Sequence, residues 1–168
     1  MRKIALFAIL FAFSAIFPAC SGKDVIASRA EHFVRSTYND VDRVLSVKVD
    51  TVTYGDNLDY RIKQARHNME FSAMMKRSYG GKAQEESLAK EKAWVAALDS
   101  LKGVSGGLLG EPTAFTCIVT YNNPSNLVWV QLDRYGNLLN ITKEQKKILL
   151  NPGEDIPGYC EEWKMYHD

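Results

Sequence analysis

The stretch TAFTCIVTYNNPSNLVWVQLDRYGNLLNI, residues 113–141, decides the fold. Its first part, Phe115–Tyr121, alternates apolar and polar residues, which is typical of a strand with one covered face. Asn122–Asn126 and Asp133–Asn137 are rich in residues that favour turns, and the second of these turns contains a glycine. The stretch therefore predicts a three-stranded antiparallel meander, with strands at Phe115–Tyr121, Leu127–Leu132 and Leu138–Ile141.

The elements before the meander are a strand and three helices. Val44–Tyr54 alternates β-branched and polar residues, so it predicts a fourth strand. Apolar residues recur at helical spacing in three segments, and Asp56 or Asn57 is the expected cap of the second helix. A pattern typical of a capping box starts a short helix after the meander. The predicted helices are Asp24–Tyr38, 57–78, Ala83–Lys102 and Thr142–Leu150.

This order of elements predicts an α+β domain, in which helices pack on one face of a small antiparallel sheet that ends in a three-stranded meander. A long helix wrapped by such a sheet resembles the cystatin-like and nuclear-transport-factor-like folds. The resemblance concerns element order alone, and it implies a fold without implying an activity.

The first twenty residues have the layout of an export signal. Arg2 and Lys3 precede the apolar run Ile4–Ala19, which ends at Cys20. A cysteine directly after the small residue at the cut resembles a bacterial lipoprotein signal, although Phe17 stands where an aliphatic residue is usual. The resemblance implies that Cys20 is lipidated and becomes the mature amino terminus. It also implies an exported protein that is anchored to a membrane through this lipid.

Two other interpretations of the same segment stay open. Cleavage without lipidation would give a secreted protein, and an uncut segment would be an anchor, although the apolar run is shorter than the ~20 residues that span a bilayer. Ser21 after the cysteine resembles cargo of the outer membrane, so we expect an outer-membrane or cell-surface location. The predicted organisation is a signal peptide at 1–19, a lipidated tether at 20–24 and one globular domain at 25–168.

The charge balance limits the classes of partner. Without Arg2 and Lys3, the 21 basic residues of the chain fall to 19, against 20 acidic residues. A nearly neutral domain without runs of lysine and arginine argues against nucleic acid as a partner. It argues equally against a polybasic segment that binds membrane surfaces. We therefore expect another envelope protein or a small ligand.

Cysteine usage suggests one disulfide. If Cys20 carries lipid, Cys117 and Cys160 form an even pair in an oxidising compartment. Such a bridge would stabilise the fold by about 4 kcal/mol on chain-entropy grounds. The alternative is that Cys117 is a small buried residue on a strand.

The sequence offers no catalytic constellation, cofactor motif or metal site. The three histidines, His32, His67 and His167, lack the paired spacing of a zinc site. His67 and Glu70 can share a helix face as an acid–base pair, although the same spacing is usual for a plain surface contact. No serine lies in a G-x-S-x-G turn, and the glycine-rich segment Val104–Pro112 lacks the Lys-Ser/Thr of a phosphate-binding loop.

An aromatic patch on the sheet is the candidate binding surface. Trp129 alternates with the apolar residues of its strand, so it belongs to the more polar face, and Tyr121 and Tyr135 lie near it in the predicted meander. The alternative is that the C-terminal tail covers this face, with Trp163 packed back on the domain.

These observations predict an envelope-anchored lipoprotein that acts as a non-catalytic binding or inhibitory module. One alternative is an enzyme whose site is a buried carboxylate or histidine in a concavity between helix and sheet. The other is a structural protein that associates with itself through the sheet.

Overall fold

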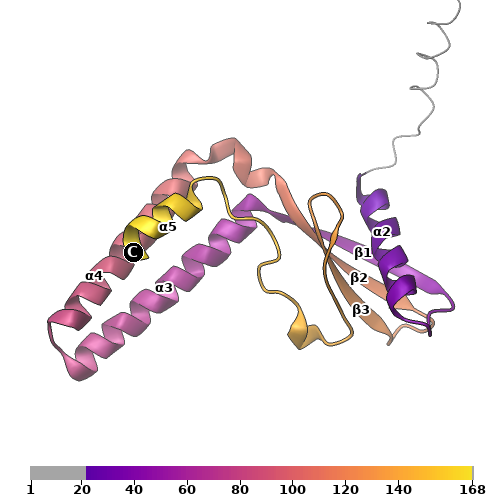
Figure 1. The fold of residues 1–168 in the computed structure, drawn as a ribbon, viewed down its shortest axis with the longest axis horizontal. Helices are drawn as coiled ribbons and strands as arrows, with labels where there is room; N and C mark the ends of the chain where they lie inside the picture. The colour runs from indigo at the N-terminus through magenta and orange to yellow at the C-terminus, as the bar shows by residue number, and fades with distance from the viewer. Residues whose placement is uncertain (1–21, 168) are drawn as a thin grey trace, which may run out of the picture.

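The computed structural model describes residues 22–167, so the predicted signal and Cys20 lie outside the described residues. A helix and a strand come first, then two long helices, three strands and a C-terminal helix (Figure 1). Gly22–Asp24 of the predicted tether already belong to the first of these helices. The bounds are α2 Gly22–Thr37, β1 Val44–Thr53, α3 Tyr54–Tyr79, α4 Lys82–Val104, η1 Gly106–Gly110, β2 Pro112–Tyr121, β3 Leu127–Asp133, β4 Leu138–Thr142, η2 Gln145–Lys147 and α5 Tyr159–His167.

The four strands form one antiparallel sheet in the order β1-β2-β3-β4. The predicted meander is therefore confirmed as β2, β3 and β4, and β1 pairs with its free edge. Cys117 stands opposite Val49 on one side and Val130 on the other. In the turn between β3 and β4, Gly136 has a φ of 81°, which side chains other than glycine rarely adopt. The predicted α+β class is confirmed.

Helix α2 covers one face of the sheet. Its residues Ile26, Ala30 and Val34 recur every four positions, so they lie on one side of the helix, and all three are buried. They meet alternate residues of the strands to form an apolar cluster that we call the sheet core. Its buried members are Ile26, Ala30, Val34, Cys117, Val119, Tyr121, Val128, Val130 and Leu132.

The long helices α3 and α4 form a hairpin that extends away from the sheet instead of covering it (Figure 1). The expected wrapping of a long helix by the sheet is therefore not found among residues 22–167. The cause lies where the strand ends. The Thr53 hydroxyl accepts from the amide of Asp56, whose carboxylate accepts from the Thr53 amide at 2.8 Å. This capping box starts α3 directly at the end of β1, with Thr53 as the cap in place of the expected Asp56 or Asn57, and leaves no loop to turn the helix back.

The base of the hairpin has a core of its own. Helix α5 lies against α4, and Trp94 is buried with the rings of Tyr159 and Tyr166 at 5.5 and 5.7 Å. Trp163, which we expected to pack on the domain, is 42% exposed and stacks on His167. We call this second cluster the base core. Its buried members are Tyr54, Leu58, Ile62, Ala65, Trp94, Leu98 and Ile156.

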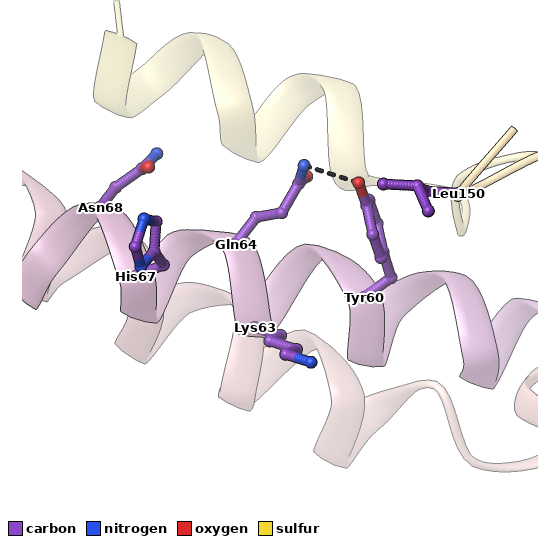
Figure 2. A pocket seen from close by; sticks show the side chains of 6 residues that line it. All are labelled: Tyr60, Lys63, Gln64, His67, Asn68 and Leu150. Carbon is purple, nitrogen blue, oxygen red and sulfur yellow. Dashed lines mark hydrogen bonds between the residues drawn. The ribbon is translucent and has the colours of Figure 1, made fainter. Parts of the chain in front are cut away.

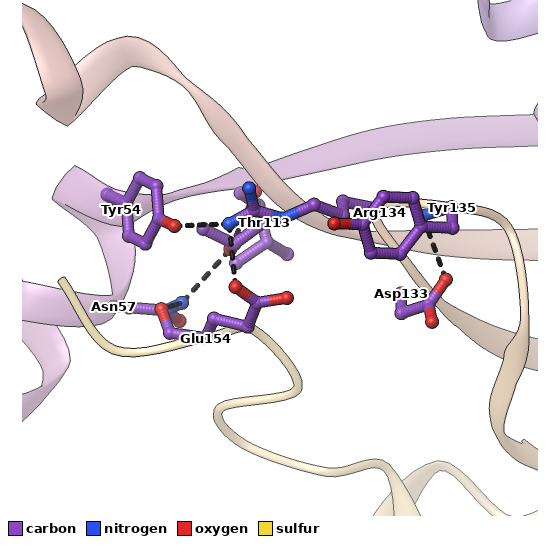
Figure 3. A network of polar contacts seen from close by, with 8 residues as sticks. Tyr54, Asn57, Thr113, Asp133, Arg134, Tyr135 and Glu154 are labelled. Carbon is purple, nitrogen blue, oxygen red and sulfur yellow. Dashed lines mark hydrogen bonds and ion pairs between the residues drawn. The ribbon is translucent and has the colours of Figure 1, made fainter. Parts of the chain in front are cut away.

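A buried polar network joins the hairpin to the sheet (Figure 3). The amide of Asn57, which is 1% exposed, donates to the Thr113 hydroxyl at 3.0 Å and to the carbonyl oxygen of Glu154 at 2.6 Å. A Cβ at Gly153 would lie 2.2 Å from the Asn57 Nδ2, so only glycine allows the chain to pass this close. Arg134 adds an ion pair with Glu154 at 2.7 Å. These contacts hold the base of α3 against the start of β2.

The segment after β4 differs from the predicted helix at Thr142–Leu150. It contains only the three-residue turn η2 and then runs under the sheet. The side chain of Gln131 bonds to both backbone groups of Leu149, at 2.9 and 3.0 Å, and Asn140 donates to the carbonyl oxygen of Lys147. The sheet's side chains thus take the backbone groups that a helix would use internally, which explains why the helix does not continue.

Candidate functional site

The three residues of the predicted aromatic patch do not come together. Tyr121 is 3% exposed and belongs to the sheet core beneath α2. Trp129 is half-buried on the opposite face, where it pairs with Ile118 and Thr142 of the neighbouring strands. Tyr135 is 70% exposed in the turn between β3 and β4. The patch is thus corrected to a single half-buried tryptophan. Because Gln131, on the same face, is 1% exposed beneath Leu149, the chain itself covers part of that face.

Both described cysteines are free thiols. Cys117 is fully buried in the sheet core, and burial raises the pKa of its thiol to about 12, with a further contribution from the charge of Asp50. Cys160 is exposed on α5. The structure does not join the two, and the disulfide stays a prediction.

The structure contains a crevice between α3 and the segment after β4. The crevice, of about 640 Å³, lies beside α3, with Leu150 at its far side (Figure 2). Among the side chains that line it, His67 and Lys63 are exposed and Tyr60 is half-buried. Glu70, the predicted partner of His67, is exposed as well.

The distal half of the hairpin, residues 66–93, stands out because none of its side chains is buried. We call this segment the distal arm. Near its tip the contacts between α3 and α4 are polar: Ser72 faces Ser87 at 3.5 Å, and Lys76 pairs with Glu85 at 3.1 Å. Two helices without a third layer cannot enclose apolar side chains, so the arm presents them to its surroundings.

Exposed apolar and aromatic side chains lie along α3 in the distal arm, and Phe71 also borders a small pocket with Ala83 and Ser87 of α4. Phe71 and Met74 are 53% and 52% exposed, and Tyr79 at the tip is 74% exposed. On the inner face, Leu58, Ile62, Ala65 and Met69 form the stripe that meets α4. The outer stripe lies about half a helical turn from the inner one and repeats at alternating intervals of four and three residues. Its members are Tyr60, Gln64, His67, Phe71 and Met74.

The sequence already contained a signal for this surface. The inner stripe alone explains a helix packed on one neighbour, whereas Phe71 and Met74 fall outside it. A second stripe at the same spacing on the opposite side predicts a helix with two partners. The crevice of Figure 2 lies along the first part of this outer stripe, where Gln64 donates to the Tyr60 hydroxyl at 2.9 Å.

Comparisons with protein families, with curated proteins and with solved structures find no match for this chain. Within residues 22–167, no cluster of three or more histidine, cysteine, aspartate or glutamate side chains is arranged to hold a metal ion. None of the helices in this part of the chain combines the length and the apolarity needed to cross a bilayer.

Proposed function

We propose that this protein is an envelope-anchored lipoprotein and a non-catalytic binding module whose distal arm binds a helix of another envelope protein. The N-terminal resemblance to a lipoprotein signal supports the anchoring. The observation that carries the binding role is the exposure of Phe71 and Met74 on a projecting helix that has no buried residue from 66 to 93. Exposed apolar side chains gathered on one face mark interaction sites.

The spacing of the outer stripe favours a helix as the partner. Intervals of four and three residues are those at which one helix meets another along a continuous seam. Lys63, Glu70 and Arg77 flank the stripe at seven-residue intervals and alternate in charge. Flanking charges of this kind select the partner and its direction. The module therefore fits an amphipathic helix with charges of the opposite order.

Self-association is the second candidate, because the same surface can bind its own copy. The alternation of Lys63 and Glu70 favours it, since two antiparallel copies offset by one heptad bring these opposite charges together. Such a dimer would form through α3 and not through the sheet, where the segment after β4 already covers Gln131.

Site-specific photo-crosslinking in the cell envelope tests the binding role. A photoreactive residue at Phe71 should give a discrete adduct, whereas the same residue at Lys90, on α4 of the same arm, or at Leu45 on β1 should give none. Mass spectrometry of the adduct then distinguishes another protein from a second copy. Equal adducts at all three positions, or none at Phe71, would contradict the proposal.

The anchor needs its own test. Fatty-acid labelling should mark the wild-type protein and not Cys20→Ala, and the variant should leave the membrane fraction. A wild-type protein without label would remove the anchoring and leave the arm untouched, because the residues that form it do not depend on the lipid.

A further inference from the structure

A second surface lies between α2 and the sheet, at the end of the sheet where α3 begins. A groove of about 470 Å³ opens between the first turns of α2, the adjoining ends of β1 and β2, and the turn after β3. Lys23, Arg29 and Arg134 line it, and none of its lining residues is acidic. Asp24 belongs to the same turn of α2 but does not line the groove.

Two of the three cations are held in place by the fold. Arg29 lies over the turn after β3 and donates to the carbonyl oxygen of Gly136 at 3.3 Å. A Cβ at residue 136 would come within 2.7 Å of the Arg29 side chain, so the glycine makes this position accessible. Arg134 bonds to Tyr54 and Glu154 through one end of its guanidinium group (Figure 3). Its Nε is buried and has no partner among the described residues.

Apolar side chains accompany the cations. Phe115 lines the groove half-buried, while Val25 and Tyr135 are 47% and 70% exposed. An exposed tyrosine beside arginine and lysine is typical of surfaces that lie at the boundary between lipid and water. This combination also gives Tyr135 a role different from the one that the sequence suggested.

The groove lies close to Cys20 along the chain. Gly22, at its rim, is two residues from Cys20, and two residues span about 7 Å at most. A lipid on Cys20 would therefore hold the groove close to the headgroup layer.

We propose that this groove binds the headgroups of anionic phospholipids and so holds this side of the domain against the membrane. The location rests on the proposed anchoring, whereas the affinity for anionic headgroups rests on the groove alone. Because the mature chain is nearly neutral, general attraction to an anionic surface is weak, and the local cluster of three cations decides the binding.

The test uses the chain from residue 20 onward with Cys20→Ser, so that no lipid contributes. Both apolar clusters lie between Ile26 and Ile156, so the domain keeps its cores without the segment before residue 20. Binding is measured by co-sedimentation with phosphatidylcholine vesicles and with vesicles that contain about a quarter phosphatidylglycerol. Lys23→Gln/Arg29→Gln is compared with the matched variant Lys90→Gln/Lys92→Gln, whose residues lie on α4.

We expect binding to the anionic vesicles only, and a loss of about fivefold for each groove cation removed. The α4 variant should bind like the wild type, and circular dichroism should show the same melting for all three proteins. Equal losses in both variants would reduce the effect to general charge and overturn the proposal. Equal binding to both kinds of vesicle, or no binding at all, would overturn it too. None of these outcomes bears on lipidation of Cys20, which fatty-acid labelling decides separately.

Discussion

Two regions of the molecule, the sheet that α2 covers and the distal arm, differ in how many layers enclose their side chains. In the sheet core, helix and strands enclose nine buried residues, and Val34, Cys117 and Val130 are fully hidden from solvent. In the distal arm, from residue 66 to residue 93, two helices pair without a third layer and leave every residue at least partly exposed. Yet the arm also carries two exposed apolar side chains on one helix face, Phe71 and Met74. An apolar stripe thus indicates a partner, but the number of layers in the chain decides whether that partner is internal.

The base core lies between these extremes and shows what a third layer changes. The same two helices bury Leu58, Ala65 and Leu98 where α5 lies against α4, and nothing beyond the end of α5. The transition occurs within one continuous helix, α3, so it does not reflect helix propensity. It reflects where a third element, here α5, packs against the two helices. The five predictions that follow use this contrast, from the largest expected effect to the smallest.

The thiols give the sharpest contrast between covered and uncovered regions. With a pKa raised from 9.0 to about 12, the Cys117 thiol is protonated at pH 8, and its thiolate is about a thousandfold rarer than that of an ordinary cysteine. In the folded protein iodoacetamide should therefore modify Cys160 and leave Cys117 intact until denaturant is added. Peptide mass mapping checks this. Protection of both thiols, lost on reduction, would show the disulfide instead.

Truncation in the sheet core should remove much of the stability. Leu132 is fully buried, and Leu132→Ala should lower the free energy of unfolding by about 2–5 kcal/mol, through lost burial and the cavity that remains. Urea denaturation followed by circular dichroism measures the change. A loss below 1 kcal/mol, on the order of a surface substitution, would mean that the sheet core is not packed as described.

A substitution at the junction between sheet and hairpin should lower the free energy of unfolding by an intermediate amount. Asn57→Ala leaves the Thr113 hydroxyl and the Glu154 carbonyl without a buried donor, so it should cost about 1–3 kcal/mol. Asn68→Ala on the same helix is the matched control, because Asn68 is exposed, and should change stability by less than about 0.5 kcal/mol. Equal effects of the two substitutions would argue against the buried network.

Shortening the exposed side chains of the distal arm to alanine should hardly change the stability of the protein. Phe71→Ala and Met74→Ala remove exposed side chains, so each should change the free energy of unfolding by less than about 0.5 kcal/mol. A photoreactive residue at Gln64 should form an adduct in the otherwise wild-type protein. The same residue should form no adduct in the Phe71→Ala/Met74→Ala double variant. A large loss of stability would show that the arm has an internal core, and an unchanged adduct would remove the outer stripe from the binding surface.

Periodicity predicted most of the secondary structure, because alternation and helical spacing are local properties. The meander, β1 and the three longer helices before it follow from residues close in sequence. The projection of the hairpin does not follow from periodicity, because it depends on the capping box at Thr53 and on the contacts of Asn57 with Thr113 and Gly153 far along the chain. The prediction of a helix after β4 was wrong for the same kind of reason, because the side chain of Gln131 forms hydrogen bonds with the backbone of Leu149.

The candidate site was predictable in part. Tyr121 shares its strand parity with Cys117 and Val119, so alternation alone already assigned it to the covered face. Phe71 and Met74 stood outside the inner stripe of α3, which the sequence displays. What the sequence cannot display is that no other element covers them, because this depends on how far α5 reaches along the hairpin.

Hydrogen exchange along the hairpin tests the central claim most directly. In the purified protein, amides of residues 66–79 and 82–93 should exchange at least about tenfold faster than those of 55–65 and 94–104, because the distal arm lacks a covering layer. In the protein's own membranes the distal amides should become protected, while those of the sheet stay unchanged. Uniform exchange along the purified hairpin, or distal amides that stay unprotected in the membrane, would contradict the account of the arm as a binding surface.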